Sequence, residues 1–560
     1  MAARLAAARL AGFIVVAIVS STVIAGLIVG AQRDDNAGPV DLIVRNAKVY
    51  VADDLGTMAE AIAIRGNKIL KVGSEREIMR YRRPQTTVVD AKGAAVLPGF
   101  VDAHASLVAG GLARDAVQLF GAATLDEIRT RIEGWMAARP DAQWITGVGW
   151  SIDAVAEPTR GQLDAIVGDR PIRLLSQDGQ TLWVNSKALT EAAITRRTPS
   201  PAHGLIVRDR RGDATGLLRG SAVALIDRVV PKPTREERAK ALQLAIRDAQ
   251  RQGITSAQDV GAAPGDMDLY DAARDAGLLG LRVYAAVPGE RTTAADLDAI
   301  AKRYPDDPLL KTGLATIAFD GSVESQTAAM LSPYTPRGSG DGDAQMTAAR
   351  LSALVASLDG LGWQVAIDAA GDRAVRTALD AIAAVAKPAQ GGKTPRHRIE
   401  GIATVAPEDI LRFGALGVIA SMQPLHATGD DLLTWTKNLG PERAPLGWPA
   451  RSLSAAGAQL AFGTDWPRLP LAPLDGLRAA VQRPDLHAPE QLTLKSAING
   501  WTSGAAWASF DEHRKGRVKA EMLADLVILS NDIFKNPANL SAAEIAMTIF
   551  DGKIVYRRTT

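Results

Sequence analysis

Strands and helices alternate through most of this 560-residue chain, and this alternation constrains the fold more than any other feature. For example, Thr234 and Glu237 form a capping box that begins a helix, and the strand ITSAQDVG at 254–261 follows that helix. Repeated β–α units predict a parallel sheet with helical connections. No glycine-rich phosphate-binding loop follows the first strand, which argues against a doubly wound dinucleotide-binding sheet. The alternation of strands and helices in residues 97–514 therefore favours a (β/α)8 TIM-like barrel with insertions.

Short alternating segments at both chain ends predict a second, smaller β domain. Residues 41–96 contain several such segments with a Gly-Asn turn, and residues 515–560 contain others with an Asp-Gly turn. The simplest packing joins the two ends into one composite β-sandwich. The less regular stretch at about 110–225 is expected to be an insertion after the first barrel strand.

An uncharged apolar segment covers residues 11–31 and is about as long as a membrane-spanning helix needs to be. Residues 1–10 carry two arginines, and acidic residues follow in the linker 32–40, so the positive-inside rule places residues 1–10 in the cytoplasm. We expect a single-pass anchor in the inner (cytoplasmic) membrane, with the bulk of the chain in the periplasm. The competing interpretation is a signal peptide cleaved after Val-Gly-Ala at 29–31.

Charge and composition exclude several function classes. The net charge of +2 gives no strong field to attract nucleic acid, so no nucleic-acid partner is expected. The chain contains no cysteine, which excludes disulfides, thiolate metal ligands and a cysteine nucleophile. The partners we expect are an unknown small molecule or a protein complex in the membrane or periplasm.

In a TIM-like barrel, the residues that act on a ligand lie at the C-terminal ends of the strands. An ordinary hydrolytic zinc site there combines several histidines with one or more carboxylates. Here the predicted strand ends are rich in carboxylates and poor in histidine: they carry His104, Asp259, Asp368, Gly401 (after Glu400), Gln423 and Asp465. From the residue types alone, this set predicts at best a weak, oxygen-rich metal site.

Several motifs occur in a fixed order along the chain: VLPGFVDAHA, DGQTLWVNSKAL, AFDGS, AGDRAV, RHRIE, GVIASMQP, GTDWP and LADLVIL. From about residue 41 to 558 the chain therefore resembles the amidohydrolase superfamily, in its amidohydrolase-3 (YtcJ-like) branch. The resemblance implies a TIM barrel with a β-sandwich made from both chain ends. It also implies hydrolysis of C–N or related bonds with one or two divalent metals.

Most of the family's metal-binding positions carry other residues in this sequence. The second histidine of the family's His-x-His is Ser106, and the position of its metal-bridging lysine is Thr316. Two later histidines are replaced by Asp368 and Gly401. Asp465 stands as the family has it, and the resemblance implies that it binds metal and exchanges a proton with the attacking water. A dinuclear metal centre is therefore not expected.

The metal donors that remain are His104, Asp368 and Asp465. One nitrogen and two oxygen ligands would suit a single Mn²⁺, Fe²⁺ or Ca²⁺ better than Zn²⁺. Without a metal, the two carboxylates would repel each other unless one is protonated or a cation lies nearby. Arg373 and Arg468 are close enough in the sequence to supply that cation.

The resemblance also suggests residues that contact a substrate. The family's substrate-side histidine is Gln180 here, and the residues that we expect to line the pocket are Gln180, Trp183, Asp320, Gln423 and Trp466. A serine nucleophile at Ser106 would need a base within hydrogen-bond reach, and His104 on the same strand face is only a weak indication of one.

These observations favour a membrane-anchored, extracytoplasmic amidohydrolase-like protein whose metal centre is degenerate. Such a pseudoenzyme would act as a binding or scaffold subunit and would need no cofactor. The alternative is a metal-dependent hydrolase of C–N (amide-type) bonds that uses one divalent metal at a reduced mononuclear site. The two hypotheses differ in whether the purified protein binds a metal ion tightly.

Overall fold

The computed structural model describes residues 39–559, apart from positions 54, 156, 264, 336–339, 387–394, 429–431, 484 and 537. The predicted membrane helix at 11–31 lies outside these residues and stays a prediction. Among the helices of the described segments, none is both long and apolar enough to cross a bilayer.

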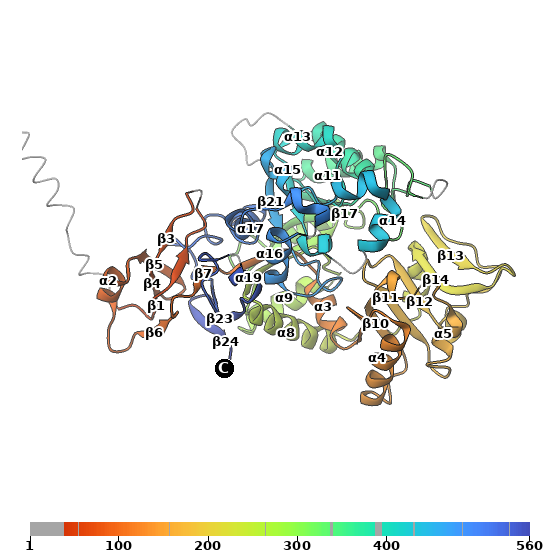
Figure 1. The fold of residues 1–560 in the computed structure, drawn as a ribbon, viewed down its shortest axis with the longest axis horizontal. Helices are drawn as coiled ribbons and strands as arrows, with labels where there is room; N and C mark the ends of the chain where they lie inside the picture. The colour runs from red at the N-terminus through yellow and green to blue at the C-terminus, as the bar shows by residue number, and fades with distance from the viewer. Residues whose placement is uncertain are drawn as a thin grey trace, which may run out of the picture.

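Eight parallel strands form a nearly closed barrel at the centre of the molecule, which confirms the predicted TIM-like architecture (Figure 1). The strands pair in chain order: β8 (Phe100–Ala105), β15 (Ile254–Asp259), β16 (Arg282–Pro288), β17 (Leu310–Ala318), β18 (Gln364–Ala369), β19 (Arg398–Gly401), β20 (Ile419–Met422) and β21 (Gln459–Phe462). The chain after β21 closes the barrel against β8, because Asp465 N donates to His104 O and Ser106 N donates to Trp466 O, each at 2.8 Å. The barrel therefore closes at its C-terminal mouth.

Helices between the strands cover the outside of the barrel. They include α8 (Arg235–Arg251), α9 (Asp266–Asp275), α10 (Ala294–Arg303), α11 (Ala348–Gly360), α12 (Asp372–Val385), α13 (Pro407–Leu416) and α15 (Ala450–Ala455). Three more helices follow the last strand: α16 (Pro473–Val481), α17 (Leu494–Gly500) and α18 (Ser503–Ala508). The predicted capping box begins α8: Glu237 N donates to Thr234 Oγ1 at 3.2 Å, and Thr234 N donates to the Glu237 carboxylate at 2.7 Å. One face of α8, with Leu242 and Ile246, is buried in the barrel core.

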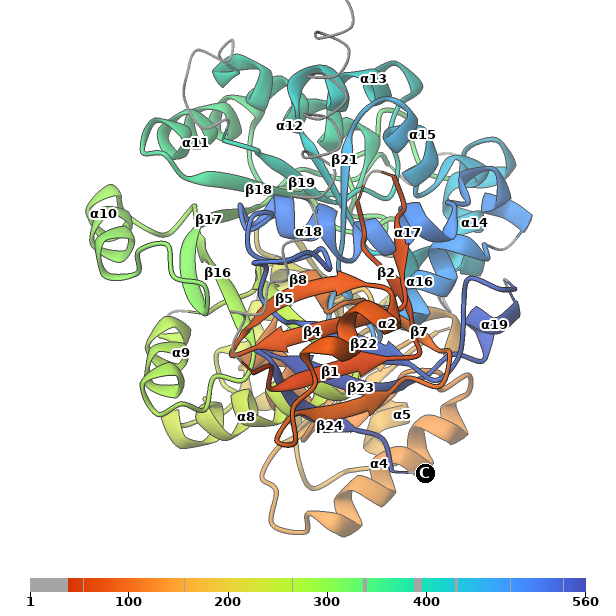
Figure 2. The ribbon, with the colours of Figure 1, turned by 90° about the vertical axis from the view of Figure 1, so that its left-hand side faces the viewer.

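The two chain ends build two further sheets beside the barrel (Figure 2). β7 from the N-terminal side pairs antiparallel with β22 from the C-terminal side, so one sheet contains both ends. Apolar side chains of the two sheets, among them Ile62, Ile64, Leu526 and Ile549, pack in one cluster. The sheets consist of β5 (Lys68–Gly73), β4 (Ala61–Arg65), β1 (Leu42–Arg45) and β6 (Thr87–Asp90), and of β24 (Lys553–Arg557), β23 (Ile545–Phe550), β22 (Leu526–Leu529), β7 (Ala95–Pro98), β2 (Lys48–Tyr50) and β3 (Met58–Ala59).

A fourth sheet lies between β8 and α8 in the chain, at the opposite end of the molecule from the two end sheets (Figure 1). Its strands are, in spatial order, β13 (Gly204–Arg208), β14 (Ala214–Gly220), β12 (Thr181–Val184), β11 (Ile172–Ser176), β10 (Ile145–Trp150) and β9 (Val117–Gln118). Helices α4 (Leu125–Ala138), α5 (Arg160–Asp164) and α6 (Ser186–Glu191) belong to the same segment. The turn between β11 and β12, residues 177–180, reaches the mouth of the barrel.

A buried ion pair joins the barrel to the end sheets. The Arg282 guanidinium, on β16, contacts both carboxylate oxygens of Asp525 at 2.6 and 3.0 Å and the Asp551 carboxylate at 2.8 Å. Arg282 and Asp525 are both almost fully buried. Burying a charge is costly unless a partner compensates it. Removing either partner would therefore leave the other charge buried without compensation and would destabilise the fold.

We predict that Arg282→Met lowers the free energy of unfolding by about 3–5 kcal/mol, because the substitution leaves the Asp525 carboxylate buried without its cation. Urea denaturation followed by tryptophan fluorescence measures the change. The matched control is Lys302→Met, which removes an exposed ion pair with Asp298. This control is expected to cost less than about 0.5 kcal/mol. Equal losses in the two variants would show that the buried pair has no special role.

Candidate functional site

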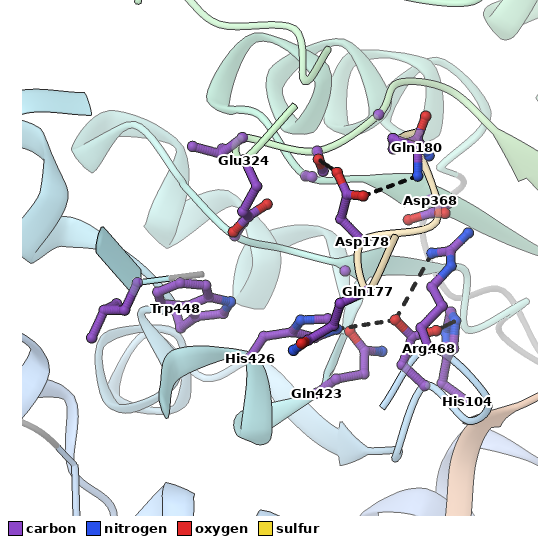
Figure 3. A pocket seen from close by; sticks show the side chains of 18 residues that line it. His104, Gln177, Asp178, Gln180, Glu324, Asp368, Gln423, His426, Trp448 and Arg468 are labelled. Carbon is purple, nitrogen blue, oxygen red and sulfur yellow. Dashed lines mark hydrogen bonds and ion pairs between the residues drawn. The ribbon is translucent and has the colours of Figure 1, made fainter. Parts of the chain in front are cut away.

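A cavity that is partly open to solvent lies between the barrel mouth and the turn at residues 177–180 (Figure 3). A second cavity adjoins it. The two cavities share four lining residues: His104, Asp368, Asp465 and Arg468. These side chains form the wall between the two cavities and are the centre of the candidate site.

His104, at the end of β8, lies between two carboxylates. Its Nδ1 hydrogen-bonds the Glu400 carboxylate at 2.7 Å, and its Nε2 is 3.5 Å from Asp465 Oδ1. Burial lowers the pKa of His104, but its contacts with Asp465 and Glu400 outweigh that effect and raise the pKa to about 10. At neutral pH the imidazole is therefore a cation with both ring nitrogens protonated.

Asp465 follows β21 and is contacted by three cationic or imidazole groups. His426, in the turn Pro424–Thr428, places Nε2 3.0 Å from Asp465 Oδ2, and the Arg468 guanidinium is 3.8 Å from the same oxygen. Burial raises the pKa of Asp465, but Arg468, His104 and His426 lower it far more, to well below its ordinary value. Asp465 is therefore a carboxylate whose two oxygens are already occupied.

Glu400 has a cation of its own inside the barrel. The Arg398 guanidinium is fully buried and contacts the Glu400 carboxylate, Gln258 Oε1, Ala103 O at 2.6 Å and Ser421 Oγ at 3.1 Å. Burial raises the pKa of Glu400, but the charges of Arg398 and His104 bring it below its ordinary value. Arg398 thus balances the charge of Glu400 without any bound ion.

Asp368, at the end of β18, lies next to Gly401 on the neighbouring strand β19. Gly401 has φ +84°, and a Cβ atom there would lie 2.9 Å from Asp368 Oδ1. A side chain at 401 would therefore require the Asp368 carboxylate to shift, and the left-handed φ of Gly401 disfavours other residues there. Burial raises the pKa of Asp368, and the opposing effects of Arg468 and His104 are smaller.

The side chains at this site do not fit a divalent metal ion. Both ring nitrogens of His104 face carboxylates, Gly401 offers no side-chain donor, and Asp465 is held by His104, His426 and Arg468. The guanidinium of Arg468 carries a fixed positive charge beside the carboxylates that a metal would need. Within the described part of the chain, no group of three His, Asp or Glu side chains is arranged to hold a metal.

Ser106 and Thr316 line the second cavity, where the resemblance places a histidine and a lysine. Ser106 Oγ lies against the backbone of Gly261, and Thr316 Oγ1 donates to Val287 O at 3.4 Å. His104 cannot serve as a base for Ser106, because its two ring nitrogens are engaged with Glu400 and Asp465. The small side chains leave open space at these positions.

Two of the predicted pocket residues, Gln180 and Gln423, line the first cavity, but three others lie elsewhere in the described structure. Trp183 is fully buried against Trp150 in the core of the inserted sheet. Asp320 is buried and accepts hydrogen bonds from three backbone N–H groups at 2.8–2.9 Å, so it holds a loop in place. The indole of Trp466 packs on Gly110, which leaves it no room to face the cavity.

Five further residues line the first cavity without having been predicted as pocket residues from the sequence: Gln177, Asp178, Glu324, His426 and Trp448. Gln177 and Asp178 lie in the same turn of the inserted sheet as Gln180. The prediction that Gln180 lines the pocket could therefore have been extended to these two neighbours. Asp178 accepts hydrogen bonds from Ser322 Oγ at 2.6 Å and from the Ser325 hydroxyl, and so fixes this turn to the loop after β17. The inserted sheet therefore supplies one wall of the cavity.

Comparisons with known proteins agree with this architecture. The profile described as "Amidohydrolase family" matches residues 87–556. "Protein LONG AFTER FAR-RED 3" of Arabidopsis thaliana is 32% identical, over 92% of this chain and 91% of that protein. "Putative amidohydrolase YtcJ" of Bacillus subtilis is 29% identical, over 91% and 98%. "N-substituted formamide deformylase" of Arthrobacter pascens is 27% identical, over 93% and 99%.

Solved structures share the fold. An uncharacterized metal-dependent hydrolase from Pyrococcus furiosus superposes with a TM-score of 0.69 at 24% identity, over 88% of this chain and 99% of that one. A similar protein from Pyrococcus horikoshii gives a TM-score of 0.70 at 24% identity, over 88% and 97%.

The charge of His104 predicts a pH dependence of stability. Its pKa rises from about 6.5 in the unfolded chain to about 10 in the fold, so the folded state holds one more proton between these values. The stabilisation is complete below about pH 6.5 and is lost as the pH rises toward 10. We expect the stability gap between the wild type and His104→Asn to shrink over this range in urea denaturation. A gap that stays constant would mean that His104 is neutral in the fold.

Proposed function

The chain belongs to the amidohydrolase family, and we propose that it is a metal-independent member that binds a small polar ligand at its barrel mouth. In this proposal the protein has lost metal-dependent hydrolysis and keeps the barrel and the pocket. It then acts as a binding protein or as the ligand-responsive subunit of a complex.

The observation that carries this proposal is that the chain's own cations balance the carboxylates at the barrel mouth. His104 contacts Asp465 and Glu400, Arg398 contacts Glu400, and Arg468 is 3.8 Å from Asp465. Three positively charged side chains thus face the three carboxylates of Asp465, Glu400 and Asp368. Desolvated carboxylates need compensating charge, and here protein side chains supply it.

The family's hydrolases need a metal to activate water and to polarise the bond that breaks. In this chain the imidazoles of His104 and His426 already contact Asp465, whose pKa these neighbours and Arg468 hold well below its ordinary value. A carboxylate with such a low pKa is a poor general base at neutral pH. Both arguments support binding without metal-dependent turnover.

We predict that the full-length protein, incubated with Zn²⁺, Mn²⁺ and Fe²⁺ and then desalted, retains less than about 0.1 metal ion per chain. Mass spectrometry of the metals measures the content, and EDTA should leave the melting temperature unchanged. Stoichiometric metal, together with activity on a panel of amides, would instead establish the alternative of a mononuclear hydrolase.

Removing the competing cation should create affinity for a metal. In Arg468→Met, the carboxylates of Asp465 and Asp368 lose a positive neighbour, so we expect Mn²⁺ to bind at least about tenfold more tightly than to the wild type. Isothermal titration calorimetry measures the affinity. Arg350→Met, which alters an exposed arginine at the start of α11, is the control and should bind Mn²⁺ like the wild type. Unchanged binding in Arg468→Met would show that Arg468 is not what excludes metal.

A further inference from the structure

We propose that the edge of the end sheets around α2 (Glu75–Ile78) is a membrane-docking surface that binds anionic lipid headgroups. Four arginines form this surface, which we call the basic edge: Arg76, Arg80, Arg82 and Arg83. The basic edge is separate from the barrel mouth, so this inference does not depend on the function proposed for the cavity.

The arginines of the basic edge gather on one helical segment and the turn after it. α2 continues into a 3-10 turn, Met79–Tyr81, so Arg76 and Arg80 are four residues apart and lie on one face. The Arg83 guanidinium folds back and donates to Arg80 O at 3.1 Å and to Arg82 O at 2.9 Å. All four arginines are exposed. The surface therefore presents four positive charges to the solvent within a few residues of chain.

Carboxylates of the protein do not neutralise this charge. The acidic residues of α2 have other partners, because Glu75 pairs with Arg45 at 2.9 Å and Glu77 pairs with Lys71 at 3.3 Å. Among the described residues, no ion pair is found for the guanidinium groups of the basic edge. Like charges that are held together repel one another unless anions lie nearby. The basic edge thus fits a partner with a high density of negative charge.

The chain enters the described structure beside the basic edge. Val40 O accepts a hydrogen bond from Thr86 Oγ1 at 2.8 Å, and Thr86 is only three residues after Arg83. The buried side chain of Val40 also packs in one apolar cluster with Ile78 of α2. The chain that leads back to the apolar segment 11–31 therefore starts at the same edge of the fold as the four arginines.

The short distance along the chain favours a lipid bilayer as the anionic partner. The steps from residue 31 to residue 39 span at most about 28 Å when fully extended. If residues 11–31 cross the membrane as the sequence predicts, this tether keeps the basic edge at a high effective concentration beside the headgroups. Anionic headgroups attract arginines within about one screening length of the bilayer. Tyr81, which lies between the arginines and is partly exposed, is a residue type that is enriched at this interface.

Docking through the basic edge would also orient the cavity. Figure 1 shows α2 at one end of the molecule and the inserted sheet at the other. The cavity lies between the barrel mouth and a turn of that inserted sheet. A protein that lies on the bilayer through its basic edge therefore carries the cavity on the side away from the lipid.

The experiment reconstitutes the full-length protein into lipid vesicles and measures how close the basic edge lies to the headgroups. The chain contains no cysteine, so a fluorophore reacts only with one introduced beside the basic edge, in Gln85→Cys. Energy transfer to a headgroup-labelled lipid reports the proximity. We expect at least about twofold more transfer in vesicles that contain phosphatidylglycerol than in pure phosphatidylcholine. This excess should disappear in about 1 M NaCl, where the screening length falls to about 3 Å.

A second label position is the control. Glu133→Cys places the fluorophore on the exposed side of α4, in the inserted segment at the other end of the molecule. Its transfer should be low and equal in both kinds of vesicle. Equal transfer from Gln85→Cys in both lipids, or an equally strong response from Glu133→Cys, would overturn the proposal. Protein that neither enters the vesicles nor cosediments with the anionic ones would overturn it as well.

Charge-removal variants test which arginines are responsible. The test variant replaces three exposed arginines of the basic edge: Arg76→Gln, Arg80→Gln and Arg82→Gln. The control variant replaces three exposed arginines of the inserted segment: Arg129→Gln, Arg210→Gln and Arg211→Gln. Both variants should keep the melting temperature of the wild type. We expect the excess transfer from the label at position 85 to be lost in the test variant and kept in the control. An excess that survives in the test variant, or that falls equally in both, would contradict docking through the basic edge.

Discussion

The contact of His104 with two carboxylates is the interaction on which the barrel mouth depends. It joins β8 to Glu400 on β19 and to Asp465 beyond β21, so it connects the ends of strands that are far apart in the sequence. Arg398 extends the network toward the barrel axis through Gln258 and Ser421. Because each charge in this network has a partner, the cost of burying these charges is reduced.

Four residues at the barrel mouth depend on one another's positions. Gly401 leaves the space that the Asp368 carboxylate occupies, and the Arg468 guanidinium lies 3.8 Å from the Asp465 carboxylate. Gly401 has φ +84°, a backbone conformation that favours glycine.

The inserted sheet supplies one wall of the cavity. Its turn at residues 177–180 brings Gln177, Asp178 and Gln180 over the mouth of a barrel whose other walls come from strand ends. Asp178 fixes the turn through the hydroxyls of Ser322 and Ser325. The ligand preference of such a site depends on the insertion as much as on the barrel, as is common where loops on a rigid scaffold carry function.

The sequence by itself determined the barrel and the strand ends that carry His104, Asp368 and Asp465. Periodicity and motif order are local signals, and each strand places its last residues at the same edge of the sheet. The sequence also named Arg373 and Arg468 as candidate cations without choosing between them. The structure chooses Arg468, because Arg373 donates to the backbone carbonyls of Met330 and Gly342.

Only the tertiary structure decided which groups meet. The contacts of His104 with Glu400 and Asp465 join residues some 300 positions or more apart, and no local pattern specifies such pairs. The same holds for Trp183 and Trp466, which lie near family motifs but are packed into cores. The direction in which these two indoles point depends on how the inserted sheet and the closing loop pack. Whether a segment forms a helix or a strand, in contrast, follows from its own sequence.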